Sequence, residues 1–234
     1  MAKYYDELTV LKTMIEQTNA NPFDQSMNHH PNQVDWNERV LCNNSMFDQR
    51  SSDKNFDLEK YIHYDDLLEI LQFNESYMKQ FDICRTYNIK QYVLPERVNH
   101  PFNTRAIYRY DERQNELILE WELPDSIAKK DLILQEEFSV SGAVIVFVAP
   151  LYEIMKRYGP IGYKTALQEV GSIAHYTWLQ SLTYGYQGTV FAGFIQKVLR
   201  RFTMIDGYYE GQLFAYAFGH EKKRGMHPSS PLFR

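Results

Sequence analysis

Apolar residues recur at helical spacing in two stretches of the chain beyond residue 45. Between Tyr163 and Tyr184 they keep the 3.6-residue period of an amphipathic α-helix, and Gly185 supplies a stop signal. From Tyr64 to Leu71 a shorter stretch has the same period, and acidic residues open it, where they complement the positive end of a helix. We therefore predict a helix over each stretch.

Five other stretches have the patterns of β-strands. Residues 143–149 form a continuous apolar run that Pro150 ends, which is typical of a central strand covered on both faces. The other four strands are predicted over Ile89–Leu94, Arg105–Tyr110, Asn115–Leu123 and Leu213–Phe218, with a hairpin around Glu112–Gln114. We find no internal repeat, so the pattern predicts a mixed α+β domain.

The first 45 residues differ in kind from the rest of the chain. Residues 3–17 have apolar positions at helical spacing, whereas residues 18–44 are rich in Asn, Gln, His and Pro and can bury little surface. We divide the chain into an N-terminal helix and polar extension, residues 1–45, and one folded domain, residues 46–234. His29 and His30 have no second ligand pair at metal-site spacing, so a solvated loop is favoured over a metal site.

Composition narrows the class of protein. The 234 residues suit one large domain, and 44% hydrophobic and 24% charged residues are usual in globular proteins. The net charge of −5 disfavours binding to nucleic acid or to an anionic membrane, and no stretch approaches the ~20 apolar residues of a membrane span. Cys42 and Cys84 lie far apart, so we expect no disulfide scaffold, no metal and a cytoplasmic location. The aromatic content of 15% suits a planar ligand or a large aromatic interface.

One short segment could bind phosphate. The glycine-rich GxGxxG and GKS loops are absent from the sequence, but residues 50–56 place two cations and two hydroxyls within five residues. Arg50 and Lys54 could neutralise a phosphate dianion, and Ser51 and Ser52 could donate hydrogen bonds to its oxygens. By itself such a segment is more often a solvated turn.

The same segment resembles the opening phosphate motif of the FMN-dependent nitroreductase superfamily, which has an Arg, a Ser two residues on, a basic residue two further, and then an aromatic. Residues 157–171 and 184–194, at the two ends of the long predicted helix, look like the SagB-type branch of that superfamily. Residues 87–95 and 107–111 are also similar to that branch, whose members oxidise thiazolines and oxazolines in ribosomally made peptides. The resemblance runs in a consistent order over most of the predicted domain.

The resemblance implies a fold, an assembly and a cofactor. The fold would be a nitroreductase-like α+β sandwich with a central mixed sheet flanked by helices, in an intertwined homodimer that holds FMN between subunits. Arg50, Ser52 and Lys54, with Ser51 beside them, would bind the phosphate and ribityl end. Ala192 and Gly193 match the turn whose backbone N–H approaches flavin N5. Lys222 and Arg224 are candidates to close the phosphate site, with a solvated tail as the alternative.

The implied reaction is oxidation of a peptide azoline to an azole, beside the cyclodehydratase that makes the azoline in the precursor peptide. The proton-transfer Lys-Tyr pair of this branch aligns with Arg157 and Tyr158. Arginine cannot serve as a base because it stays protonated. Tyr158, assisted by Arg157, or else Lys156 or Lys164, would then move the proton. The alternative for Tyr158 is that it only packs before Gly159.

Two departures from the branch keep other functions open. Asp82 to Arg85 replace a Pro-Ser-Ala-Gly stretch that forms one wall of the flavin pocket, and Arg85 could either replace the lost contact or fill the pocket. One alternative is an FMN-dependent reductase that uses NAD(P)H on an activated double bond, a nitro group or a quinone. The other, suggested by residues 82–88 and Arg157, is a non-catalytic structural subunit of a peptide-modifying complex.

Overall fold

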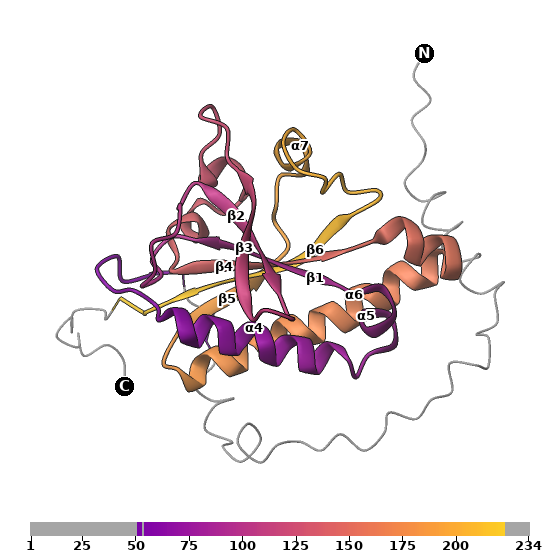
Figure 1. Ribbon diagram of the computed structural model, residues 1–234, viewed down its shortest axis with the longest axis horizontal. Helices are drawn as coiled ribbons and strands as arrows, with labels where there is room; N and C mark the ends of the chain where they lie inside the picture. The colour runs from indigo at the N-terminus through magenta and orange to yellow at the C-terminus, as the bar shows by residue number, and fades with distance from the viewer. Residues whose placement is uncertain (1–50, 53, 223–234) are drawn as a thin grey trace, which may run out of the picture.

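A six-stranded sheet forms the centre of the protein (Figure 1). The computed structural model describes residues 51–52 and 54–222. The strand order of the sheet is β3-β2-β1-β4-β6-β5, and each neighbouring pair of strands is antiparallel. The strands are β1 (Lys90–Pro95), β2 (Ala106–Asp111), β3 (Glu116–Glu122), β4 (Ala143–Ala149), β5 (Gln187–Phe191) and β6 (Gly211–Gly219). All five predicted strands are confirmed, with ends shifted by one or two residues, and β5 was not predicted.

The sheet has less parallel pairing than the mixed sheet that the sequence analysis predicted. β4 and β5 run in the same direction and are connected by a helix, which usually places two parallel strands side by side. Here β6 is inserted between them, and it is antiparallel to both. Among the described residues, parallel pairing is confined to two isolated bridges, Ser52 with Gly188 and Ile62 with Val98.

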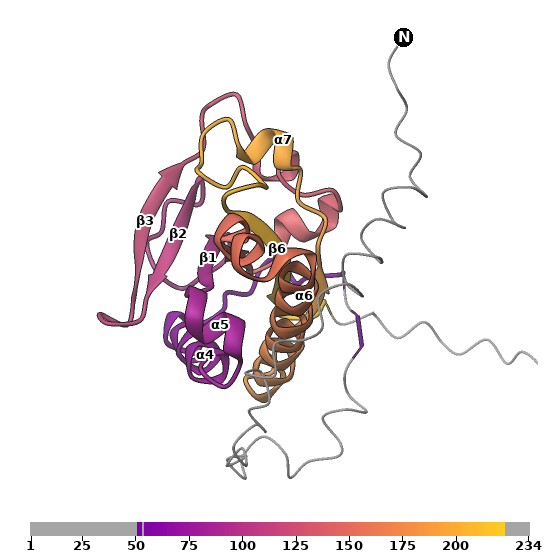
Figure 2. The ribbon, with the colours of Figure 1, turned by 90° about the vertical axis from the view of Figure 1, so that its right-hand side faces the viewer.

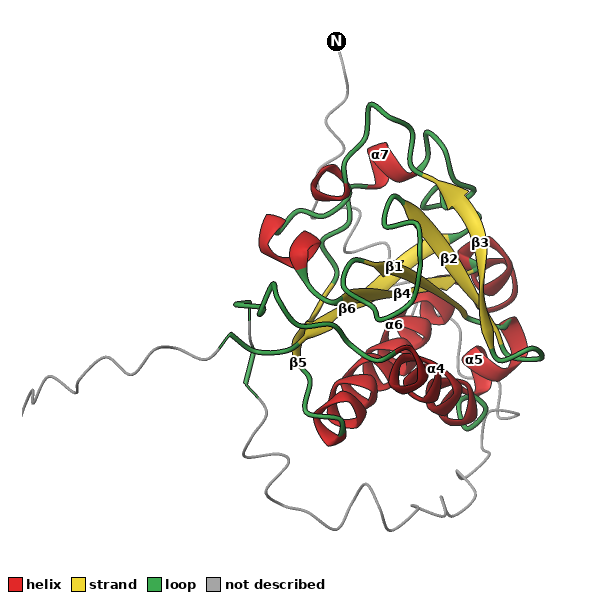
Figure 3. Cartoon of the chain, turned by 60° about the vertical axis from the view of Figure 1, so that its left-hand side comes forward, coloured by secondary structure: helices red, strands yellow, loops and turns green. Residues whose placement is uncertain are grey.

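Helices pack on one face of the sheet, and short turns and loops cover the other (Figures 2 and 3). The first face carries α4 (Tyr64–Met78), α5 (Asp82–Tyr87) and α6 (Leu151–Thr183). Residues of η2 (Lys129–Asp131), η3 (Glu136–Val140), α7 (Gln196–Leu199) and their connections border the second. The sheet therefore separates two apolar cores.

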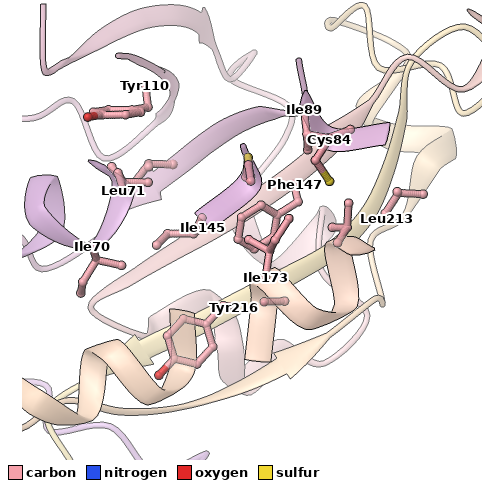
Figure 4. Close-up of a cluster of buried hydrophobic side chains, with 14 of the residues drawn as sticks. Ile70, Leu71, Cys84, Ile89, Tyr110, Ile145, Phe147, Ile173, Leu213 and Tyr216 are labelled. Atoms are coloured by element: carbon pink, nitrogen blue, oxygen red, sulfur yellow. The ribbon is translucent and has the colours of Figure 1, made fainter. Parts of the chain in front are cut away.

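Strand β4 contributes to both cores, as its continuous apolar run predicted. Every residue from Ala143 to Ala149 is buried. Ile145 and Phe147 lie in the core on the helix side, whereas the alternating residues Val144, Val146 and Val148 face the opposite core. Figure 4 shows Ile145 and Phe147 together with Ile173 of α6. The prediction of a central strand is confirmed.

Helix α6 begins at Leu151 rather than at the predicted Tyr163. Its path is broken at Gly159, where φ is 61° and ψ is −154°, a conformation that glycine adopts without a side-chain clash. Pro160 then opens a second helical segment, in which proline is tolerated because the first-turn N–H groups need no intrahelical partner. The sequence analysis predicted only the second segment, because Gly159 and Pro160 interrupt the helical pattern between the two segments.

A buried chain of polar side chains ties α4, β1 and α6 together. Thr177 donates to the Asn74 amide oxygen at 2.9 Å, and the Asn74 amide nitrogen donates to Gln91 at 2.8 Å. Gln91 in turn donates to a carboxylate oxygen of Glu75 at 2.8 Å. Burial raises the pKa of Glu75 above the usual value, and the hydrogen bond from Gln91 only partly offsets this shift.

The raised pKa of Glu75 predicts a pH-dependent gain in stability from Glu75→Gln. The folded protein binds this proton more tightly than the unfolded chain, so stability present at low pH is lost as pH rises through the folded-state pKa. We expect Glu75→Gln to raise the urea midpoint at pH 7 and to leave it unchanged near pH 3. The same substitution at exposed Glu116 is the control. Equal midpoints for wild type and Glu75→Gln at pH 7 would contradict this account.

Candidate functional site

The segment after Ser51 lies between β5 and the end of the described chain. Ser52 forms a parallel bridge with Gly188 of β5, and Phe56 forms an antiparallel bridge with Glu221. The backbone N–H of Lys222 donates to the Asn55 carbonyl at 2.9 Å. Folding thus brings together Ser52, Lys54 and Lys222, three residues that the sequence analysis assigned to a phosphate site.

Lys54 has an acidic partner in the structure. Its ammonium lies 3.1 Å from the carboxylate of Glu137, and both side chains are exposed. A hydrogen bond from the backbone N–H of Glu137 and the nearby Lys54 lower the pKa of this carboxyl. Glu137 is therefore ionised at neutral pH, and a bound phosphate would share Lys54 with it or displace it.

The turn at Ala192 and Gly193 follows β5 directly. The Leu134 N–H donates to the Gly193 carbonyl at 2.7 Å, which fixes one side of the turn. A Cβ atom at Gly193 would lie 2.5 Å from the side-chain oxygen of Gln135, so this position requires glycine as long as Gln135 stays in place. That oxygen of Gln135 is buried and has no hydrogen-bond partner among the described residues.

The distance between the cluster of Ser52, Lys54 and Lys222 and the turn at Ala192 and Gly193 suits FMN. Ala192 is four residues beyond Gly188, and at about 3.3 Å per residue this places the turn roughly 13 Å from the bridge of Ser52. Lys54, Lys222 and the serine hydroxyls can bind a phosphate at one end of this span. A ribityl chain can cross it, and a planar ring would lie at the other end, beside the turn where the side-chain oxygen of Gln135 approaches Gly193. The donor set therefore fits FMN.

Gln135 and Glu137 are site residues that the sequence analysis missed. They lie in the connection between β3 and β4, and they contact Gly193 and Lys54, which belong to the two ends of the candidate site. No local motif marks them, because their position depends on how the connection folds over the sheet. Their contacts are visible only in the tertiary structure.

Three of the predicted features cannot be placed. Arg50 and Arg224 lie outside the described residues, as does the extension of residues 1–45 with His29 and His30. Their roles stay predictions. Within residues 51–52 and 54–222, no group of three or more His, Cys, Asp or Glu side chains could hold a metal ion. In that same part of the chain, no helix has the length and apolarity to cross a membrane.

Arg157 and Tyr158 lie at the other end of the sheet. Both belong to the first segment of α6, which begins where Ala149 pairs with Gly211, whereas Ser52 and Lys54 lie near the opposite end of β6 at Gly219 (Figure 1). The nine residues of β6 make this separation roughly 26 Å. One chain therefore does not bring this pair to its own candidate phosphate site.

The surroundings of Tyr158 are aromatic and cationic. Its ring centroid is 6.1 Å from that of Tyr87, and the Arg157 guanidinium lies 5.4 Å from the Tyr158 ring centroid. Burial, followed by the neighbouring Tyr158, raises the pKa of Tyr87. Tyr158 is half-buried, while Arg157 and Lys164 are exposed. Tyr158 is thus held by a ring contact and is still reachable from solvent.

The segment that departs from the SagB-type pattern forms the short helix α5. Arg85 is exposed and pairs with Asp82 at 2.8 Å, so it fills no pocket in this chain. The backbone N–H groups of Ile83 and Cys84 donate to the carboxylate of Glu169 at 3.3 and 2.9 Å. Glu169 anchors the first turn of α5 against α6.

Comparison with known proteins identifies the fold. No family model matches the sequence, and no curated protein is similar to it at the sequence level. A protein of Anabaena variabilis described as a nitroreductase superposes with a TM-score of 0.62 and 16% identity, over 76% of this chain and 38% of that one. A Ralstonia eutropha protein with the same description gives 0.55 and 16%, over 76% and 82%. The chain therefore has the nitroreductase-like fold.

A further neighbour matches over almost the whole chain. It is a chain of the Escherichia coli microcin synthetase McbBCD complex, solved with truncated pro-MccB17 bound. The TM-score is 0.60 and the identity 16%, and the match covers 94% of this chain and 96% of that chain. The Anabaena protein is much longer than this chain, whereas the McbBCD chain has nearly the same extent.

Proposed function

We propose that this protein is an FMN-dependent dehydrogenase that oxidises thiazoline or oxazoline rings of a precursor peptide to the aromatic azoles. The observation that carries the proposal is the match to the McbBCD chain over 94% of this chain and 96% of that one, because that complex was solved with a pro-peptide bound. The SagB-type motifs at residues 157–171 and 184–194 point to the same chemistry.

The proposed reaction removes two hydrogens from the ring, one as a proton and one as a hydride equivalent. When bound, FMN would accept the hydride equivalent and be reoxidised by oxygen. Lys54, Lys222 and the hydroxyls of Ser51 and Ser52 would hold the phosphate, with Arg50 as a further cation. The backbone of the turn at Ala192 and Gly193 would face the ring, beside the side-chain oxygen of Gln135. Tyr158 would take the ring proton, with the guanidinium of Arg157 beside its ring.

This assignment requires a homodimer, because Tyr158 packs on the helix side of the sheet, whereas the residues around Gly193 lie in the core on the other side. We infer that Tyr158 of the partner subunit completes each site. The protein should then sediment as a dimer, and its melting temperature should rise with FMN concentration because the ligand binds only the folded state. A monomer in sedimentation that carries FMN would contradict the shared site.

The proposed function has a direct test. The purified protein should show the absorption bands of oxidised flavin, and it should convert a thiazoline-containing peptide to a product that has lost two hydrogens by mass spectrometry. A cyclodehydratase is the expected partner, since it supplies the azoline. If the protein binds flavin but leaves the thiazoline intact, the proposed dehydrogenase function is wrong.

Two other functions are favoured by particular observations. The nitroreductase descriptions of the Anabaena and Ralstonia neighbours favour a reductase, for which NADPH oxidation in the absence of peptide is the expected result. The ion pair between Lys54 and Glu137 favours a structural subunit, because it neutralises one phosphate-binding cation. A purified protein that lacks flavin and does not bind added FMN would support the structural role.

A further inference from the structure

Four large side chains stand exposed at the end of the sheet near the start of α6. We call them the tyrosine–methionine patch, and their exposed fractions lie between 44% and 74%. Its members are Tyr152, Met155, Tyr208 and Tyr209. The two segments that supply them touch each other, because the Tyr152 and Tyr209 rings are 5.1 Å apart and the Tyr152 N–H donates to the Tyr209 carbonyl at 3.4 Å.

The patch is built on a fixed backbone. A carboxylate oxygen of Asp206 accepts hydrogen bonds from the N–H groups of Tyr208 and Tyr209, both at 2.8 Å, and the same contacts lower the pKa of Asp206. Glu210 forms an ion pair with Lys90 of β1. On the helix side, Leu151 and Ile154 are buried, so their turn is held against the sheet while Tyr152 and Met155 face outward.

The chemistry of the patch suits an extended peptide better than a permanent subunit interface. Permanent subunit interfaces are large and strongly hydrophobic, whereas the patch is small and its three tyrosines each carry a hydroxyl. Tyrosines offer a flat apolar ring and a hydroxyl that can bond the free N–H and C=O groups of an extended chain. Methionine adapts to different side chains. Exposed Glu153, Lys156 and Arg157 form a polar rim, with Lys156 5.7 Å from the Tyr152 ring centroid.

The patch also continues to the candidate proton-transfer residue. Met155 lies one helical turn before Tyr158 on the first segment of α6, and Tyr152 lies one turn before Met155. We propose that the tyrosine–methionine patch docks an extended stretch of the precursor peptide and directs its azoline ring to Tyr158. The planar azole product would stack on the same rings. This inference rests on the proposed function for the identity of the peptide.

The test is peptide binding to the double variant Tyr152→Ser with Tyr209→Ser. The probe is a synthetic fluorescein-labelled peptide of glycine and serine residues with one thiazoline, and anisotropy gives its dissociation constant. We expect an increase of about tenfold or more, because two ring contacts are lost. FMN affinity and the dimer should stay unchanged. In turnover assays KM for the peptide should rise, with kcat close to that of wild type.

A matched control separates docking from a general loss of apolar surface. Tyr61→Ser with Leu119→Ser removes two side chains of similar exposure elsewhere, and its peptide affinity should equal that of wild type. Unchanged affinity in the patch variant would overturn the proposal. Conversion of that variant to a monomer would overturn it as well, because the patch would then be a subunit contact. If the wild-type protein binds the probe through these tyrosines but binds no FMN, the proposed function is wrong. The docking surface would then still be supported.

Discussion

Replacing Arg50 and Lys54 together by alanine should weaken FMN binding by about a hundredfold or more. Each substitution removes a charge-assisted contact to the phosphate, and two such contacts contribute about 3 kcal/mol or more. Flavin fluorescence quenching during titration of the apoprotein measures the change. Unchanged affinity would place the phosphate elsewhere in the fold.

Two further variants test the phosphate site. One is a matched control, and the other is expected to change FMN affinity in the opposite direction. Lys79→Ala with Arg85→Ala removes the same two types of cation, each of which also has an acidic partner, and should leave FMN affinity unchanged. Glu137→Gln frees Lys54 from its carboxylate and should tighten FMN binding. Weaker binding in Glu137→Gln would show that the carboxylate positions Lys54 and does not compete with phosphate.

Tyr158→Phe should slow peptide-dependent flavin reduction by a factor on the order of a hundred while FMN and the dimer are retained. The variant keeps the ring that contacts Tyr87 and removes only the hydroxyl. Stopped-flow measurement of flavin bleaching with a thiazoline peptide gives the rate. The control is Tyr163→Phe, a half-buried tyrosine on the second segment of the same helix. A near wild-type rate in Tyr158→Phe would move the base to Lys156 or Lys164.

Local pattern predicted five of the six strands, the helix α4 and the second segment of α6. The apolar run at residues 143–149 predicted the central strand, and the acidic start at Tyr64 predicted α4. Strand β5 was missed because its five residues include Gly188, which weakens a strand pattern. Here glycine is required, since a Cβ would lie 2.3 Å from the Ala217 carbonyl oxygen on β6.

The candidate site was predictable only in part. The motif at residues 50–56 and the turn at Gly193 were found from sequence because each is local. Gln135 and Glu137 were not, because they reach the site through a connection whose path depends on tertiary packing. Sequence order also gave no sign that Arg157 and Tyr158 would lie near the far end of β6.

The insertion of β6 between β4 and β5 affects how the protein can fold during synthesis. β6 comes last in sequence among the six strands, but it lies inside the sheet and pairs with both β4 and β5. Until residue 219 has left the ribosome, β4 has one unpaired side and β5 has no neighbouring strand. The sheet is therefore completed late, through contacts distant in sequence, which form slowly and leave apolar strand edges open to chaperones or to aggregation in the meantime.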